Sequence, residues 1–437
     1  MTKLSGHRER ALLIGCALKS RSRNSPPGLP LLSLEESLEE LAFLTASAGG
    51  EAVLRLTQER EQIDPAYFIG RGKLEEIKEL AAKWRTGTVI FDENLSPAQL
   101  RNLERASGCK VIDRTQLILD IFARRARTKE GKLQVELAQL EYLLPRLAGK
   151  GVELSRLGGG IGTRGPGETK LETDQRKIRR RIHTIKEELE RVRSHRQLHR
   201  SFRHSIPVPV ISLVGYTNAG KSTLFNTMTG AVSYVSNQLF ATLDPLLRRL
   251  QLPSGREVIL SDTVGFIHKL PHSLISAFRA TLEEVCEADL LVHVIDISNP
   301  AHPLQREAVY QVLEEIKVAD KTVLEVYNKI DLMQELSCLR DRKGSLLVSA
   351  ALGTGLPALL ERIDELLTSD PVEQARFVFQ HSEGAIVSRL HNQARLIQQS
   401  YQEDEVLVEV EAPRSVLQRF RQWEKKAATP EPAGMEP

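Results

Sequence analysis

Short apolar runs alternate with amphipathic segments along the first quarter of the chain. The apolar runs predict strands at Ala11–Leu18, Ala52–Thr57, Thr88–Phe91 and Lys110–Ile112. Apolar residues at intervals of three or four predict helices at Leu34–Ala48, Lys73–Lys83 and Pro97–Ala106. Two of these helices carry start signals, a capping box from Ser33 to Glu36 and Ser96 followed by Pro97. Alternation of this kind predicts a mostly parallel α/β unit.

The pattern changes after residue 115, where helical periodicity dominates. Helices are predicted at Leu117–Ala126 and Gly131–Leu147, and Pro145 is expected to bend the end of the second. A glycine-rich stretch, 158–167, precedes a long charged helix that we expect from Glu168 to Arg203. The apolar positions of this helix are Ile178, Ile182, Ile185, Leu189 and Val192. Two long helices on either side of a glycine-rich tip predict an αα-hairpin.

Pro207 and Pro209 mark a linker to a second α/β unit, which we expect to run from Val210 to about Ser369. The segment Arg376–Trp423 has the pattern strand, helix, strand, helix, and residues 427–437 are rich in Pro and Glu and are expected to fray. We therefore predict an N-terminal α/β domain over residues 1–115 and a helical hairpin over 116–205. A mostly parallel α/β domain is predicted over 206–370 and a small C-terminal α/β domain over 371–437.

Composition is that of a folded protein, because 41% of the 437 residues are hydrophobic and 27% are charged. No apolar run approaches the roughly 18 residues that a membrane-spanning helix needs. The cysteines are too few and too scattered for a disulfide framework or a Cys-rich metal site: Cys16, Cys109, Cys286 and Cys338. We expect a cytoplasmic protein, monomeric when free, with peripheral membrane association left open.

The run after the predicted strand Val210–Val214 matches the phosphate-binding pattern G-x-x-x-x-G-K-[ST]. Its members are Gly215, Tyr216, Thr217, Asn218, Ala219, Gly220, Lys221 and Ser222, and Thr223 opens the helix that follows. The glycines allow the backbone to wrap tightly, so that successive N–H groups point at phosphate oxygens. We expect Lys221 to reach the β- and γ-phosphates and the Ser222 hydroxyl to bind Mg²⁺.

Three further segments follow in the order that a GTPase requires. They are Asp262, Thr263, Val264 and Gly265, then Asn328, Lys329, Ile330 and Asp331, and finally Ser349, Ala350 and Ala351. Asp262 is expected to hold Mg²⁺ through water, and the Gly265 N–H to sense the γ-phosphate. The Asp331 carboxylate is a natural partner for the adjacent N1–H and N2–H donors of guanine. Together these segments predict a P-loop, guanine-nucleotide-binding domain with helices on both faces of its sheet.

The candidate switch segment is Phe240, Ala241, Thr242, Leu243 and Asp244, in which Thr242 is expected to complete the Mg²⁺ shell. The residue after Gly265 is Phe266, not the glutamine that orients water in Ras-like enzymes, so intrinsic hydrolysis should be slow or use another group. Asn218 is either a ligand for K⁺ beside the phosphates or an ordinary loop residue. The catalytic candidates are therefore Lys221, Thr242, Gly265 and Asn218.

The long helix is the most basic part of the chain. Between Lys170 and His204 there are twelve Lys and Arg against five Asp and Glu, which favours contact with a phosphate backbone over a merely solvated face. Candidate RNA-binding residues are Arg164, Lys170, Arg176, Lys177, Arg179, Arg180 and Arg181. No aromatic residue lies between Gly158 and Arg200, so RNA would be recognised by shape and charge.

The sequence resembles bacterial HflX-type, ribosome-associated GTPases over nearly its whole length. The family-specific strings are Tyr67–Lys73, Leu95–Glu104, Asp113–Asp120, Gly159–Thr169 and Gly215–Asn226. The resemblance implies a GTPase that binds the large ribosomal subunit and splits stalled ribosomes under stress. It also implies that the hairpin loop is directed towards the peptidyl-transferase region.

Other functions are compatible with the same motifs. One is a GTPase that acts in ribosome assembly or RNA modification, although no catalytic or folate-binding module is recognisable. Another is a nucleotide-gated RNA-binding protein with negligible turnover, which Phe266 makes conceivable. A P-loop kinase for small molecules is disfavoured, because Asn328–Asp331 specifies a base and no acceptor motif is visible.

Overall fold

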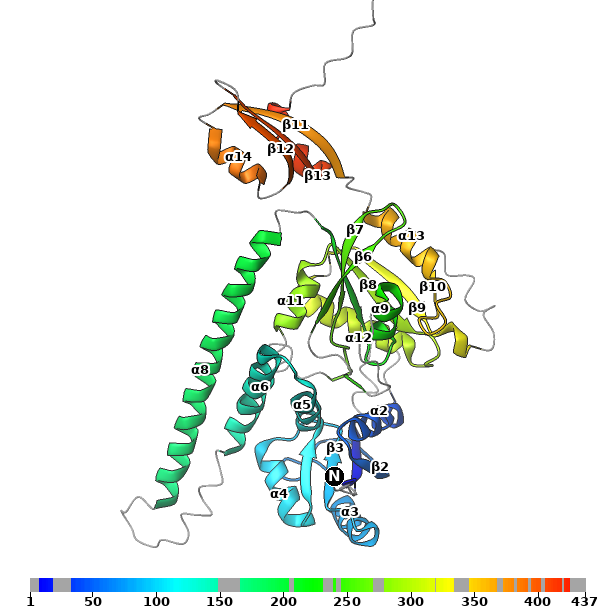
Figure 1. Ribbon diagram of the computed structural model, residues 1–437. Helices are drawn as coiled ribbons and strands as arrows, with labels where there is room; N and C mark the ends of the chain where they lie inside the picture. The colour runs from blue at the N-terminus through cyan, green and yellow to red at the C-terminus, as the bar shows by residue number, and fades with distance from the viewer. Residues whose placement is uncertain are drawn as a thin grey trace, which may run out of the picture.

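The structure is a computed structural model. It describes residues 8–18, 33–147, 166–203, 208–230, 239–240, 245–269, 279–318, 320–333, 346–367, 372–380, 383–391, 394–401, 405–418 and 420–424. Three units follow one another along the molecule, with the N-terminal unit at one end, the unit of the phosphate-loop motif in the middle and the C-terminal unit at the other end (Figure 1). Within the described ranges, no helix has the length and apolar character needed to cross a membrane.

The N-terminal unit is built on a four-stranded parallel sheet in the order β2-β1-β3-β4. Its strands are β1 (Arg10–Leu18), β2 (Glu51–Arg60), β3 (Thr88–Phe91) and β4 (Lys110–Asp113). Its helices are α2 (Leu34–Ser47), α3 (Arg71–Trp84) and α4 (Pro97–Ser107). Both faces of the sheet are covered, because Leu13 packs into one hydrophobic core while Leu12 and Ile14 pack into another. The predicted alternation of strands and helices is confirmed.

Local capping fixes the helix starts in this unit. The Ser33 hydroxyl accepts from the Glu36 N–H while the Glu36 side chain accepts from the Ser33 N–H, as the capping box predicts. Helix α5 (Arg114–Arg125) begins three residues before the predicted start at Leu117, because the Asp113 carboxylate accepts from the Gln116 N–H and caps it.

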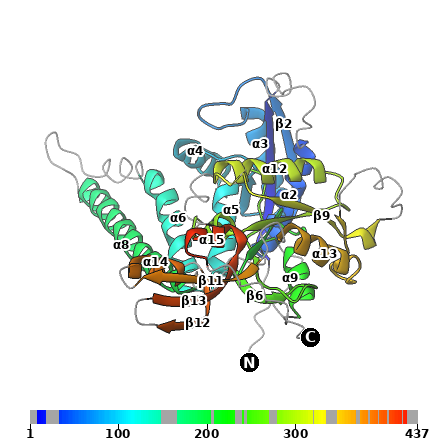
Figure 2. The same cartoon turned by 90° about the horizontal axis from the view of Figure 1, so that it is seen from above.

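The helical hairpin consists of α6 (Lys129–Leu147) and α8 (Pro166–Arg203). Pro145 lies within α6, which continues to Leu147. The two helices meet along a narrow apolar seam made by Leu133, Leu137, Leu140, Ile182, Ile185 and Leu189. Three of these are among the predicted apolar positions of the long helix. Seen from above, α6 and α8 project together to one side of the molecule (Figure 2).

The middle unit has a six-stranded sheet in the order β10-β9-β8-β5-β7-β6. The strands are β5 (Val210–Gly215), β6 (Leu246–Gln251), β7 (Glu257–Asp262), β8 (Leu290–Asp296), β9 (Val323–Asn328) and β10 (Leu346–Leu347). Of these described strands, only β6, at the edge, runs antiparallel to its neighbour. The helices are α9 (Lys221–Thr229), α11 (Arg279–Glu287), α12 (His302–Glu315), the short η1 (Ile330–Leu332) and α13 (Leu356–Leu367). This arrangement confirms the predicted mostly parallel fold.

The C-terminal unit differs from its predicted pattern. It contains β11 (Val372–Gln380), α14 (Gly384–His391), β12 (Arg395–Tyr401), β13 (Glu405–Pro413), α15 (Arg414–Gln418) and η4 (Arg421–Trp423). The order is therefore strand, helix, strand, strand, helix, and the sheet is antiparallel in the order β11-β13-β12. The prediction of two strands was wrong because β12 is an exposed edge strand that lacks an apolar alternation. The predicted frayed end, residues 427–437, lies outside the described residues.

We expect a buried histidine, His293, to make the stability of the middle unit sensitive to acid. The His293 side chain on β8 is buried and packs edge-on against Tyr310, with 5.4 Å between ring centroids. Burial lowers the pKa of His293 from 6.5 to about 4. Between these pH values the unfolded chain binds the proton and the folded chain does not. The free energy of unfolding should therefore fall as the pH drops from 6.5 towards 4, by up to about 1.4 kcal/mol per pH unit.

We expect His293→Phe, which keeps the ring and removes the titrating group, to lose this part of the acid sensitivity. Urea unfolding at pH 7, 6 and 5 measures how the free energy of unfolding changes with pH in the variant and in the wild type. His302→Phe, at the start of α12, removes a histidine elsewhere in the same unit and is the matched control. If the free energy of unfolding depended on pH equally in the wild type and in His293→Phe, the assignment to His293 would be contradicted.

Candidate nucleotide site

The phosphate loop lies at the carboxyl end of β5. The strands β6 and β7 that follow β5 lie on one side of it in the sheet, and β8, β9 and β10 lie on the other side. Open α/β sheets bind ligands at this position. Glycine is required at both ends of the loop. An ideal Cβ on Gly215, with φ of 151°, would lie 2.3 Å from the Val294 carbonyl oxygen. A Cβ on Gly220, with φ of 95°, would lie 2.2 Å from Asn328 Nδ2. The backbone therefore comes closer to its neighbours than any side chain permits.

Lys221 is enclosed by the loop that it follows. Its Nζ donates to the carbonyl oxygens of Gly215 at 3.0 Å and Tyr216 at 2.7 Å, and the side chain is buried. Burial lowers the pKa of Lys221 to about 8, and the nearby Asp262 carboxylate offsets only part of this effect. A buried ammonium group without full charge compensation favours an incoming polyanion.

Oxygen ligands gather beside Lys221. The Ser222 hydroxyl donates to Asp262 Oδ2 at 2.7 Å, which joins the start of α9 to the end of β7. A hydroxyl and a carboxylate side by side are hard oxygen donors, so this pair fits Mg²⁺. Thr263 has a different task, because its hydroxyl donates to the Leu213 carbonyl oxygen at 2.6 Å and ties β7 to β5.

Asn328 joins the loops at the base side of the site. Its Nδ2 donates to the Ala219 carbonyl oxygen at 2.9 Å, and its Oδ1 accepts from the Ala350 N–H at 2.9 Å. The Ala350 N–H is thus engaged within the protein, and it can read guanine O6 only by sharing or releasing this bond. Sequence reasoning did not reveal these bridges, which depend on loops distant in the chain.

The carboxylate of Asp331 is exposed and oriented by a neighbour, since its Oδ1 accepts from the Ser349 hydroxyl at 2.5 Å. Lys329 has φ of 67°, and its Nζ donates to Asp296 Oδ2 at 2.6 Å. Together with Asn328, these contacts bring the segments 328–331 and 349–350 to the same edge of the sheet as the phosphate loop. The phosphate loop, the segment that begins at Asp262 and these two segments therefore converge.

The segment after Asp262 is hydrogen-bonded onto the phosphate loop. The Thr217 N–H donates to the Phe266 carbonyl oxygen at 2.7 Å, and the Phe266 N–H donates to the Gly215 carbonyl oxygen at 3.1 Å. The Phe266 side chain is buried in the hydrophobic core. It cannot orient a water molecule, as its sequence position already indicated. Asn218 is exposed in a left-handed turn with φ of 62°, and its role towards K⁺ stays a prediction.

Several predicted site residues fall outside the described part of the chain. These are Ala241, Thr242, Leu243, Asp244 and Arg164, and the Lys170 side chain is likewise not described. Phe240, predicted as part of the nucleotide site, is described, and its side chain is buried in the hydrophobic core. It packs against Phe122 of α5 with ring centroids 4.6 Å apart. The side chain of Phe240 thus holds the N-terminal side of the switch segment against α5.

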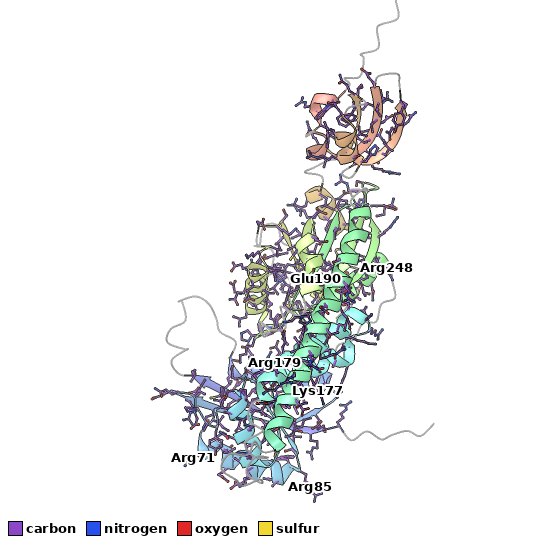
Figure 3. All side chains as sticks on the ribbon, turned by 90° about the vertical axis from the view of Figure 1, so that its left-hand side faces the viewer. Arg71, Arg85, Lys177, Arg179, Glu190 and Arg248 are labelled. Carbon is purple, nitrogen blue, oxygen red and sulfur yellow. The ribbon has the colours of Figure 1, made fainter. Side chains whose placement is uncertain are left out.

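The basic residues of α8 divide into two groups. Arg181 is engaged within the hairpin, because its Nε and Nη2 donate to the two carboxylate oxygens of Glu136 at 2.7 and 2.8 Å. The side chains of Arg176, Lys177, Arg179 and Arg180 are exposed. Figure 3 views the side of the molecule along which α8 runs, with Lys177 and Arg179 labelled on it, Arg71 and Arg85 on the N-terminal unit and Arg248 on β6.

Sequence reasoning missed a polar cluster between the N-terminal unit and the phosphate loop. Arg114 is buried and donates to the carboxylates of Glu40 and Asp92, the latter at 2.6 Å. The Tyr216 hydroxyl donates to Glu40, and Lys269 Nζ donates to Asp92 Oδ2 at 2.5 Å. The only signal in the sequence is an acidic residue directly after a predicted strand, at Asp92.

Comparisons with known proteins match the same segments. Three family models follow one another along the chain, described as "GTP-binding GTPase N-terminal" over residues 35–123, "GTP-binding GTPase Middle Region" over 125–203 and "50S ribosome-binding GTPase" over 210–329. GTPase HflX of Caldanaerobacter subterraneus subsp. tengcongensis is 47% identical over 423 residues, which are 97% of this chain and 95% of the relative. GTPase HflX of Escherichia coli is 47% identical over 387 residues, 87% of this chain and 90% of the relative.

Proposed function

The chain belongs to the HflX family of GTPases, and on that premise we propose that it binds the large ribosomal subunit and couples GTP binding and hydrolysis to the splitting or rescue of stalled ribosomes under stress. The observation that supports this most directly is the hairpin of α6 and α8. It extends to one side of the GTPase unit and exposes a run of basic side chains on α8 (Figures 1 and 3).

For the hydrolysis of GTP, we propose a role for each residue that converges at the nucleotide site. Lys221 leaves its carbonyl partners in part and donates to the β- and γ-phosphates, while Gly265 offers its N–H to the γ-phosphate. Ser222 would bind Mg²⁺ directly and Asp262 through water, and the bound ion would supply positive charge at the phosphate oxygens. Asp331 accepts from guanine N1–H and N2–H, and Ser349 keeps its carboxylate in position.

Ribosome binding is proposed to rest on the exposed basic residues of α8. Contacts to phosphate release counterions, so they dominate affinity and make it dependent on salt. Arg181 is excluded from this group, because its bidentate pair with Glu136 stabilises the hairpin itself. The natural candidates are therefore Arg176, Lys177, Arg179 and Arg180. We further propose that ribosome contact stimulates hydrolysis, because Phe266 offers no group to orient water.

Co-sedimentation tests the proposed function. The protein is centrifuged with separated large and small ribosomal subunits in the presence of GDP or a non-hydrolysable GTP analogue. We expect co-sedimentation with the large subunit in the analogue and dissociation of whole ribosomes in sucrose gradients with GTP. Binding to the large subunit without dissociation of ribosomes would favour a role in assembly. Absence of binding to either subunit would refute the proposal.

Charge reversal on α8 gives a more specific prediction. The variant Arg179→Glu/Arg180→Glu should bind the large subunit more weakly, and the log–log slope of affinity against salt should fall by about one for each phosphate that the variant no longer binds. Basal GTP turnover should stay near that of the wild type, because these residues lie outside the nucleotide site. Arg362→Glu/Arg389→Glu, on α13 and α14, makes the same change in net charge and is the matched control. Wild-type binding of the α8 variant across a salt series would contradict the prediction.

A further inference from the structure

The sheet of the N-terminal unit also contains a position at which the strand order reverses. The chain passes from β1 to β2 on one side and to β3 and β4 on the other, so the carboxyl ends of β1 and β3 flank the place where such sheets bind ligands. Asp92 and Glu93 follow β3 directly at this place. Both of these side chains are acidic, and that of Asp92 is fully buried. We call Asp92 and Glu93 the acidic crevice.

A lysine of the middle unit, Lys269, binds to the acidic crevice. Lys269 Nζ donates to Asp92 Oδ2 at 2.5 Å and to Glu93 Oε1 at 2.6 Å. Asp92 is further held by the Ser37 hydroxyl at 2.7 Å and by Arg114 at 2.6 Å. Burial acts to raise the pKa of Asp92, but the charges of Arg114 and Lys269 outweigh it and the pKa is lowered. The carboxylate is therefore ionised and attracts the ammonium group.

A second contact links the same cluster to the phosphate loop. The Tyr216 hydroxyl donates to Glu40, which Arg114 also contacts, and it accepts from the His268 N–H at 2.7 Å. The backbone of Tyr216 belongs to the phosphate loop, and its carbonyl oxygen accepts from Lys221. The N-terminal unit thus holds both the loop and the segment Val264–Lys269 that lies on it.

The held arrangement places Gly265 against the phosphate loop and engages Lys221 within the protein. An ideal Cβ on Gly265 would lie 2.8 Å from Thr217 Cα and 3.0 Å from Lys221 Nζ, so the backbone of Gly265 packs directly on the loop and on the ammonium group of Lys221. An ammonium group has three donors, and two of those of Lys221 bind carbonyl oxygens of the loop. Contacts to both the β- and the γ-phosphate require the release of at least one of these two bonds.

We propose that Lys269 is a positioning residue for the GTPase site. By binding in the acidic crevice it holds Val264–Lys269 against the phosphate loop, and it thereby lowers the affinity for GTP relative to GDP. Because coupling between sites is reciprocal, a bound γ-phosphate must weaken the hold of the crevice on Lys269 by the same factor.

Nucleotide affinities of the full chain test the proposal. Titration calorimetry with GDP and with a non-hydrolysable GTP analogue is carried out on the wild type, Lys269→Met, Glu93→Gln and the double variant. Lys269→Met should raise the affinity for the analogue relative to GDP on the order of 5- to 10-fold. Glu93→Gln should act in the same direction. The double variant should not exceed Lys269→Met, since both changes break the same ion pair. Lys269→Arg, which keeps the charge, should restore most of the wild-type ratio.

Lys321→Met provides the matched control. Lys321 belongs to the same unit, and its Nζ donates to the Ala288 carbonyl oxygen at 2.6 Å. Lys321→Met shows the effect of losing a lysine that has only a structural contact. The ratio of the affinities for the GTP analogue and for GDP should not change in this variant. A wild-type ratio in Lys269→Met, or the same shift in Lys321→Met, would overturn the proposal.

A chemical measurement tests the reciprocal effect. Acetylation of lysines by a water-soluble active ester is followed by mass spectrometry of peptides, with Lys321 as internal reference. Lys269 should react faster in the presence of the GTP analogue than in GDP, because its amine leaves the carboxylates. Equal rates in the two nucleotides would show that the crevice does not respond to the γ-phosphate and would refute the coupling.

Discussion

Lys221→Ala should reduce GTP turnover by roughly 100- to 1,000-fold, the range found when one preorganised donor to a transition state is removed. The ammonium group is already at the phosphate loop, where it donates to two of the loop's carbonyl oxygens. Ser222→Ala should cause a loss of similar size, because it removes the hydroxyl that lies 2.7 Å from Asp262 Oδ2. Phosphate release under single-turnover conditions measures both effects.

Thr229→Ala is the control for these two variants. Thr229 lies at the far end of α9, where its hydroxyl donates to the Phe225 carbonyl oxygen at 2.7 Å. The control should keep the turnover of the wild type, and thermal melting should show that all three variants are folded. Turnover at the wild-type rate in a folded Lys221→Ala or Ser222→Ala variant would remove that residue from the site.

Asp331→Asn should exchange the preference for guanine for a preference for xanthine. The amide places a donor opposite the donors of guanine, and GTP affinity should fall by about 1–3 kcal/mol, the cost of polar groups left unpaired on burial. The carbonyl at C2 of xanthine accepts from the same amide, so xanthosine triphosphate should bind better than to the wild type. The Ser349 hydroxyl, which donates to Asp331 Oδ1, still finds an oxygen in the amide.

Titration calorimetry with both nucleotides measures the exchange. Asp320→Asn changes an exposed carboxylate of the same unit and serves as the control. Unchanged GTP affinity in Asp331→Asn, or an equal loss in Asp320→Asn, would separate Asp331 from base recognition.

Features that depend on neighbouring residues could be predicted from the sequence. The capping box at Ser33 and the long helix ending at Arg203 agree with their patterns, because caps and apolar spacing act within a few turns. The phosphate loop was recognisable for the same reason, since strand, glycines and helix are contiguous. The start of α5 was missed by three residues because Asp113 was assigned to no element, although it ends β4 and caps the helix.

Features that depend on tertiary contacts could not be predicted in this way. Arg114 follows a short strand within a polar string, yet it is buried by two carboxylates from different elements. Phe240 and Phe266 stand among motif residues, and their side chains are used for packing against the N-terminal unit and the core. A single sequence gives no information on which distant segments meet. The acidic crevice and its lysine could therefore emerge only from the structure.

Because the seam of the hairpin is narrow, a small tilt of α8 at the seam produces a larger displacement at the end of the helix. Its 38 residues form a rod about 57 Å long at 1.5 Å per residue. The helix α8 packs against α6 at Ile182 and Ile185. About 24 Å of helix separate Ile182 from the end of α8 at Pro166. A tilt of about 5° at the seam would displace that end by about 2 Å, so a small repacking of side chains becomes a shift larger than a covalent bond length.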